Sequence, residues 1–218
     1  KLNVSVKNRV GSFGDVNGDG FLDILDLIDV VDHILERRFL TGPSFVRANI
    51  APWGIGNPAP TPDAVVNVQD LAVIQNIILT GMYPSGVLVN KAVILAVNEG
   101  NSLNKTNTAA EVELYITNEG ITVRLNSPVG IRGAQLEFGS INGNTSNMII
   151  DSKLGGGFYN QINELLRVLL YDQGGNLFIE PGINYVANMP FEISNPQDIS
   201  VEKIVLADMM NQKIGTIN

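Results

Sequence analysis

The residues best suited to chemistry lie between Asp15 and Asp26, where oxygen-bearing side chains fall at positions 1, 3, 5, 9 and 12 of a twelve-residue loop. Calcium takes about six to eight oxygen ligands, and such a loop supplies them from alternate positions, with a backbone carbonyl at position 7 and a glycine at position 6. Position 12 is usually glutamate, and the shorter Asp26 would draw the following helix closer. The predicted ligands of this first site are Asp15, Asn17, Asp19, Phe21, Asp23 and Asp26.

A second copy of the pattern lies 44 residues downstream, where Asp63, Asn67 and Asp70 match three residues of the first loop. A segment rich in proline and glycine interrupts the start of this copy, so we expect Asn49 to begin the loop and the segment to bulge out. The predicted ligands of the second site are Asn49, Asp63, Val65, Asn67 and Asp70. Fewer carboxylates predict weaker calcium binding than in the first loop. The alternative is a metal-free relic that packing stabilises.

Each loop leads into a segment with helical periodicity. Apolar residues 27, 30, 31, 34 and 35 recur at the spacing of one buried helix face, which places Asp29, Asp32 and Glu36 on the solvent side. The second segment adds Val73 and Ile77 on another face, and we therefore expect this helix to contact something besides its twin. Two loop–helix halves are predicted.

The segment from Gly14 to about Leu79 resembles a dockerin, the duplicated calcium-loop and helix module that binds cohesins in cellulosomes and related surface assemblies. The motif Gly-Asp-Val-Asn-Gly-Asp-Gly, the aspartate at position 12 and the absence of a helical pattern before the loop carry this resemblance. It implies that loop position 11 and nearby helix residues meet a cohesin. Together with the two additional apolar residues of the second helix, the predicted partner-binding residues are Leu25, Asp32, Glu36, Gln69, Val73, Gln75, Asn76, Ile77 and Thr80.

The remainder of the chain changes to the two-residue periodicity of strands. Candidate strands cover residues 92–97, 111–117, 121–125, 131–138, 147–150, 165–171, 177–180, 184–191 and 199–207. Short strands divided by Gly, Asn and Pro turns predict an all-β antiparallel sandwich of the jelly-roll kind. We therefore expect two domains: a small α calcium-binding, dockerin-like domain over residues 1–86, with a strand-like extension over 1–12, and a sandwich over 87–218.

Three phrases of the sandwich, at residues 130–138, 166–172 and 204–208, resemble cohesin modules. Carbohydrate-binding sandwiches and purely structural sandwiches share their pattern, so these two alternatives stay open. Flat polysaccharide platforms need coplanar tryptophan or tyrosine, and the single tryptophan, Trp53, lies in the other module. This composition argues against a cellulose platform and leaves a small glycan cleft open.

Composition excludes several classes of function. Acidic residues number 22 against 14 basic ones, and the net charge of −8 disfavours a nucleic-acid partner. One histidine, His33, and no cysteine cannot build a catalytic triad or a zinc site of several imidazoles. Glu111 and Glu113 alternate with core positions and should both face solvent, so they do not form a glycosidase pair. No apolar run is long enough to span a bilayer. We predict a non-enzymatic protein.

The leading hypothesis is a calcium-dependent protein–protein assembly module, a dockerin–cohesin adaptor similar to a scaffoldin. Its partner would be a cohesin- or dockerin-bearing protein, and a glycan is a further candidate. Calcium loops of this kind suit the high calcium outside cells, which favours a secreted or cell-surface protein of an extracellular, polysaccharide-degrading type of complex. The alternative is a surface structural protein whose two modules pack on each other and whose sandwich binds carbohydrate.

Overall fold

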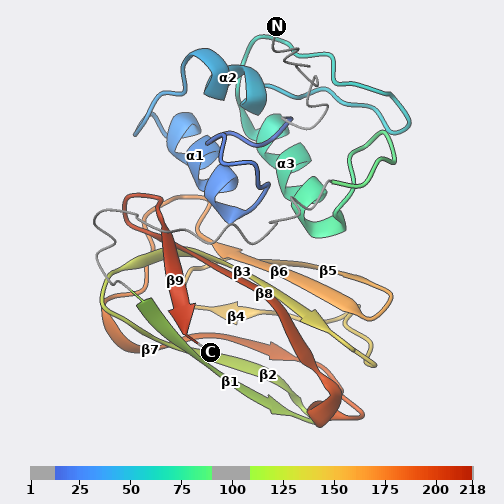
Figure 1. Cartoon of the computed structure of the whole chain (residues 1–218), viewed down its shortest axis with the longest axis vertical. Helices are drawn as coiled ribbons and strands as arrows, with labels where there is room; N and C mark the ends of the chain where they lie inside the picture. Colours follow the sequence, from blue (N-terminus) through green and yellow to red (C-terminus); the bar gives the residue numbers. More distant parts are fainter. Residues whose placement is uncertain (1–12, 90–108, 218) are drawn as a thin grey trace, which may run out of the picture.

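The computed structural model describes residues 13–89 and 109–217, which form a helical module and a β-sandwich (Figure 1). The helical module contains α1 (Ile24–Ile34), α2 (Gly42–Ala48) and α3 (Val68–Thr80). The sequence pattern indicates α1 and α3, and both begin at the expected offset of 44 residues. The short α2, which has a proline in its first turn, was not predicted. Within the described residues, no helix is long and apolar enough to cross a membrane.

The two long helices begin in the same way. Asp23 and Asn67 are their N-caps, and each accepts a hydrogen bond from the backbone N–H two residues later. Asp26 and Asp70, each three residues after its cap, reach back to the N–H of the cap residue and complete a capping box. Local sequence therefore determines where both helices start.

The expected solvent face of α1 is partly wrong. Leu27, Val30 and Val31 are buried as predicted, but Asp29 and Asp32 are each only 6% exposed. Both carboxylates lie against the sandwich, where Arg132 neutralises Asp32, whereas Asp29 pairs with the nearby Arg38 and accepts a hydrogen bond from Asn211. A helical period alone assigns charged residues to water, and it cannot anticipate a charged surface that arrives from elsewhere in the fold.

Among the residues that the structure describes, the sandwich has nine strands. They are β1 (Ala109–Thr117), β2 (Gly120–Ser127), β3 (Ile131–Gly139), β4 (Asp151–Ser152), β5 (Gly157–Ile162), β6 (Leu165–Tyr171), β7 (Gly182–Pro190), β8 (Ser200–Asp208) and β9 (Lys213–Ile217). One layer has the order β4-β7-β2-β1-β9 and the other β9-β8-β3-β6-β5, so that β9 joins both. Because β9 pairs with β1 in parallel, the expectation of a purely antiparallel sandwich needs correction.

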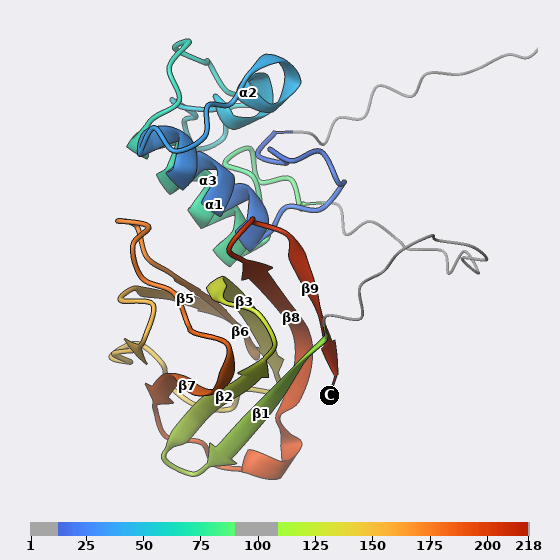
Figure 2. The ribbon, with the colours of Figure 1, turned by 90° about the vertical axis from the view of Figure 1, so that its left-hand side faces the viewer.

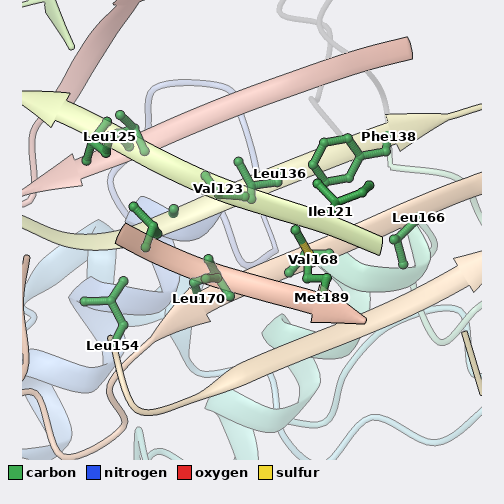
Figure 3. Close-up of a cluster of buried hydrophobic side chains, with 14 of the residues drawn as sticks. Ile121, Val123, Leu125, Leu136, Phe138, Leu154, Leu166, Val168, Leu170 and Met189 are labelled. Carbon is green, nitrogen blue, oxygen red and sulfur yellow. The ribbon is translucent and has the colours of Figure 1, made fainter. Parts of the chain in front are cut away.

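The interior of the sandwich is filled by alternate residues of facing strands (Figure 3). Leu136 and Phe138 of β3 and Val168 of β6 meet Val123 of β2 and Met189 of β7, all at most 2% exposed. Burying large apolar side chains from both layers in this way is the main stabilising contribution of a sandwich. This core contains no residue of the helical module.

Strand predictions succeeded where alternation was long. Six predicted strands match β1, β2, β3, β6, β7 and β8. Residues 147–150 form no strand and 177–180 contribute one isolated bridge, through Ile179, so those two predictions were wrong. Strands β4, β5 and β9 were not predicted. The predicted strand over 92–97 lies outside the described residues.

The outer face of the β3, β6 and β8 layer packs against α1 and α3 (Figure 2). Leu169, Tyr171, Val205 and Ala207 point to this side and belong to the same buried cluster as the helix core. Strand β3 is consequently buried along both faces, with alternate residues turned to the sandwich interior and to the helices. Residues 87–89 pack with the helical module, because the Val89 N–H donates a hydrogen bond to the Gly81 carbonyl.

Candidate functional site

The first loop folds around its own aspartates. The Asp15 carboxylate accepts the N–H groups of Gly18 and Gly20 at 2.9 and 3.2 Å. Asp19 accepts the N–H of Phe21 at 2.8 Å. Gly20, at position 6, has a φ of +89°, the left-handed conformation that the sharp turn requires. The backbone therefore has the expected loop course, with its carboxylates placed at alternate positions.

Asp26 has a structural role in addition to its predicted one. Its Oδ1 accepts the N–H groups of Val16 and Asn17 at 2.7 and 3.2 Å, and its Oδ2 accepts the Asp23 N–H at 2.9 Å. A carboxylate offers about four lone-pair sites, so three are already used by the backbone. The buried side chain thus ties the beginning of the loop to the beginning of α1.

The donor set fits a hard cation in chemistry and in order along the loop. Burial, and after it the charge of neighbouring aspartates, raises the pKa of Asp15, Asp23 and Asp26, although backbone hydrogen bonds to these carboxylates act in the opposite direction. A divalent cation would relieve that cost by compensating the charges. In the described part of the chain, no three Asp, Glu, His or Cys side chains form a ready metal cluster, so a cation would have to draw the side chains of the loop together.

The second loop repeats this backbone arrangement. Asp70 Oδ1 accepts the N–H groups of Ile50 and Ala51, both at 2.7 Å, and its Oδ2 accepts the N–H of Asn67 at 2.9 Å. These bonds are the counterparts of those that Asp26 makes, shifted so that Asn49 takes the place of Asp15. The segment between Ala51 and Asp63 is an insertion relative to the first loop. After it, Ala64 has a φ of +67°, in the same left-handed region as its counterpart Gly20.

Side chains in the second loop are less charged and more open. Asp63 is exposed and accepts the N–H of Val65 at 2.9 Å. Asn49 is 5% exposed, and its Oδ1 is a buried oxygen without a hydrogen-bond partner among the described residues. Such an oxygen is costly to bury, and a cation would satisfy it. The loop thus keeps one polar atom aligned with position 1 but has fewer carboxylates than the first loop.

Aromatic packing holds the inserted segment. The Trp53 ring stacks on Tyr83 at a centroid distance of 5.4 Å and meets Phe13 edge-on at 5.3 Å. The indole N–H donates to the Asn57 carbonyl at 3.0 Å. The indole therefore fixes the insertion against both ends of the described helical module.

The interface between the modules joins helix ends to polar side chains of β3 and β6. The Ile24 N–H, an unpaired donor in the first turn of α1, donates to Gln135 Oε1 at 3.2 Å. Arg167 donates to the carbonyl of Thr80 at 3.1 Å, at the end of α3 where carbonyls lack helical partners. Glu137 links these two, since it accepts from Gln135 at 2.8 Å and lies 3.6 Å from Arg167.

A second polar group lies farther along α1. Arg132 binds Asp32 through two hydrogen bonds of 2.9 and 2.6 Å, and these bonds raise the pKa of the Arg132 guanidinium. Asn211 donates to the Leu25 carbonyl at 2.8 Å and also to Asp29, which pairs with Arg38. A paired, largely buried carboxylate is tolerated, whereas loss of either partner would leave an uncompensated charge.

The predicted partner-binding residues divide between this interface and solvent. Asp32 and Leu25 contact the sandwich as described, and Gln75 accepts a hydrogen bond from Tyr171. Ile77 is fully buried and Val73 packs beside it in the shared core. Thr80 meets Arg167 through its carbonyl. The remaining three, Glu36, Gln69 and Asn76, are exposed.

Sequence reasoning missed the sandwich side of the interface. Its contributors are Arg132, Gln135, Glu137, Arg167, Tyr171 and Asn211. A weak signal was present, because three of these polar residues alternate with apolar ones on β3 and β6. Alternation marks a face but not what covers it.

Comparisons with known proteins find structural likeness only. No family profile and no curated protein matches the sequence. One solved structure similar to this chain is a type I cohesin–dockerin complex from Clostridium thermocellum, at 11% identity over 54% of this chain and 93% of that one, with a TM-score of 0.38.

Two other solved structures give the same picture. A cohesin of scaffoldin B from Acetivibrio cellulolyticus, in complex with a dockerin, shows 17% identity over 51% of this chain and 94% of that one, with a TM-score of 0.38. A non-cellulosomal cohesin from Archaeoglobus fulgidus shows 13% over 51% and 85%, with a TM-score of 0.33. These overlaps cover the β-sandwich half of the chain. Because the TM-scores are low, the description of the sandwich rests on its own strand order and core.

Proposed function

We propose that this chain is a non-catalytic protein–protein assembly unit in which a calcium-organised helical module docks on the outer face of the sandwich. The observation that carries the proposal is the polar network in which Gln135 and Arg167 satisfy the start of α1 and the end of α3. Contacts with helix ends recognise a folded helix pair, because the free N–H and carbonyl groups exist only there. The face is therefore suited to a docking role.

Calcium would be held by Asp15, Asn17, Asp19 and Asp23 with the Phe21 carbonyl, and it would supply positive charge to a loop whose carboxylates repel one another. The protein's own part is to hold the loop against α1 through Asp26. Since Phe21 and Leu22 border the cleft between the modules, a change in loop conformation would reach the docking face directly. This arrangement supports the proposal that docking depends on calcium.

The setting we propose is outside the cell. Loops of this type bind calcium at the concentrations found there, and the resemblance of residues 14–79 to dockerins adds a surface assembly, such as a polysaccharide-degrading complex, as the context. A cohesin- or dockerin-bearing protein is then the expected kind of partner. The next experiment tests docking itself, independently of any particular partner.

A protease site placed between residues 90 and 108 of the full chain tests the proposal. After cleavage, the two halves should still elute together in calcium and separate when calcium is chelated. The matched control is the same chain with Asp32→Arg, which places two cationic groups together and should release the halves even in calcium. Halves that separate in calcium without the substitution, or that remain together unchanged in chelator, would contradict calcium-dependent docking.

A permanently closed structural protein is a second candidate. The specific observation in its favour is that each module covers the other's docking face within one chain. One aromatic side chain of its sandwich, Tyr171, is not available to a glycan, because it is only 1% exposed beneath the helices. Capture of secreted proteins in calcium supports the assembly role, whereas glycan binding without protein capture supports the structural one.

A further inference from the structure

The contacts between the modules do not depend on which copy of the chain provides each module. The hydrogen bonds described above join the segment from Ile24 to Thr80 with the segment from Arg132 to Asn211. The chain has no cysteine, so no disulfide locks one module onto the other. A single stretch of backbone, residues 90–108, connects them. A stretch of 19 residues reaches at most about 65 Å when fully extended.

The two faces are complementary and each carries its own polar groups. The helical module presents acidic Asp32 and the carbonyls at the end of α3, and the sandwich presents the cationic Arg132 and Arg167. Water can satisfy these groups when the faces are apart. Separation also exposes the apolar residues Leu169, Tyr171, Val205 and Ala207, each at most 1% exposed in the closed chain, so an open chain is short-lived and exchange requires a second copy close by.

We propose that two copies of this chain exchange helical modules, so that α1 and α3 of each copy dock on β3, β6 and β8 of the other. The inference rests on the proposed docking function and names a second copy of the chain as a partner. In an exchanged pair, the contacts of both interfaces are kept. These include the Asp32–Arg132 ion pair, the bond of Gln135 to the start of α1 and the bond of Arg167 to the end of α3. It is the same interface, formed twice, between chains instead of within one.

Concentration decides which form prevails. Two modules joined by a short connection in one chain generally meet at an effective concentration on the order of millimolar. The closed single chain therefore dominates at micromolar protein. Exchange becomes substantial as the protein approaches about millimolar, or where copies are held close together on a surface.

Two complementary variants of the full chain test the exchange. One carries Arg132→Asp, which breaks the sandwich face, and the other carries Asp32→Arg, which breaks the helical face. Neither can close on itself without placing like charges together. In a mixture, each helical module finds a sandwich of opposite charge on the other chain, so a one-to-one dimer should form. Light scattering after gel filtration in calcium should show at least tenfold more dimer in the mixture than in either variant alone.

The single chain that carries both substitutions separates the outcomes. It restores opposite charges within one copy and should be monomeric at micromolar concentration, with a melting temperature close to that of the natural chain. A stable double variant together with a mixture that stays monomeric would overturn exchange and leave docking intact. Single variants that melt like the natural chain and remain closed would overturn docking as well, because the ion pair would then not contribute to it.

The natural chain provides the test should either variant fail to fold. Isotopically light and heavy copies, mixed at about millimolar concentration in calcium and analysed by native mass spectrometry, should give dimers that contain one copy of each. A sample that stays entirely monomeric at that concentration would overturn the proposal.

Discussion

The two loop–helix halves of the helical module share a backbone and differ in charge. Asp26 and Asp70 make the same set of hydrogen bonds to the loop and to the helix cap. The first loop then adds three carboxylates, whereas the second adds Asn49, an exposed Asp63 and an aromatic-packed insertion around Trp53. The comparison teaches that the fold of each half is maintained by hydrogen bonds of the protein, while the carboxylates suited to a cation are concentrated in one half.

The largest expected effect comes from the residues that the halves share. Asp26→Ala and Asp70→Ala should each lower the free energy of unfolding by about 3–5 kcal/mol, because each leaves buried N–H groups unsatisfied. Urea unfolding measured by circular dichroism gives both values. Asp63→Ala, at an exposed position, is the control and should cost less than about 1 kcal/mol. A near-zero effect of either buried substitution would break the structural equivalence of the halves.

Calcium binding sharpens the contrast between the halves. Calcium at about 100 times its dissociation constant should raise the free energy of unfolding by roughly 2.7 kcal/mol. The double substitution Asp15→Asn and Asp19→Asn should remove most of this gain, and Asp63→Asn with Asn67→Ala should remove less than half. Calorimetry in calcium and in chelator measures both. Equal losses from the two loops would show that the second loop binds the cation as well as the first does.

The smallest effect concerns pH in the presence of chelator. Burial raises the pKa of Asp15, Asp23 and Asp26 in the folded protein. A carboxyl with a raised folded pKa contributes stability that is complete below its unfolded pKa and is lost as pH rises through the folded pKa. The melting temperature should therefore rise as pH falls from neutral toward about 4, until other groups such as Asp172, whose pKa is lowered, reverse the trend.

The substitution Asp26→Asn is the control for this titration and should flatten the rise. Excess calcium should also flatten it, because the carboxylates of the first loop would then favour their charged form. A melting temperature that falls steadily as pH decreases from neutral in chelator would contradict raised pKa values for the carboxyls of the first loop.

Local patterns were sufficient to predict both loops, both long helices and six strands. Asp23 and Asn67 determine the helix starts through bonds only two residues away, so the sequence contains the whole cause. The burial of Asp32 has no local cause, because its partner Arg132 is 100 residues away and becomes adjacent only through tertiary packing. Strand β9 was missed for a similar reason, since its five residues become a strand by pairing with β8 and β1.

Gly133 lies at the closest approach between the modules. A Cβ at this position would lie 2.7 Å from Cδ1 of Ile28, so the glycine lets α1 approach the strand. The specificity of the contact can therefore be changed through side-chain size. A methyl group added at Gly133 and one removed from Ile28 would fit each other, whereas the enlarged strand would clash with the natural helix. Steric fit at this contact, independently of charge, can therefore determine which helical module pairs with which sandwich, so sets of variants that do not pair with one another can be designed.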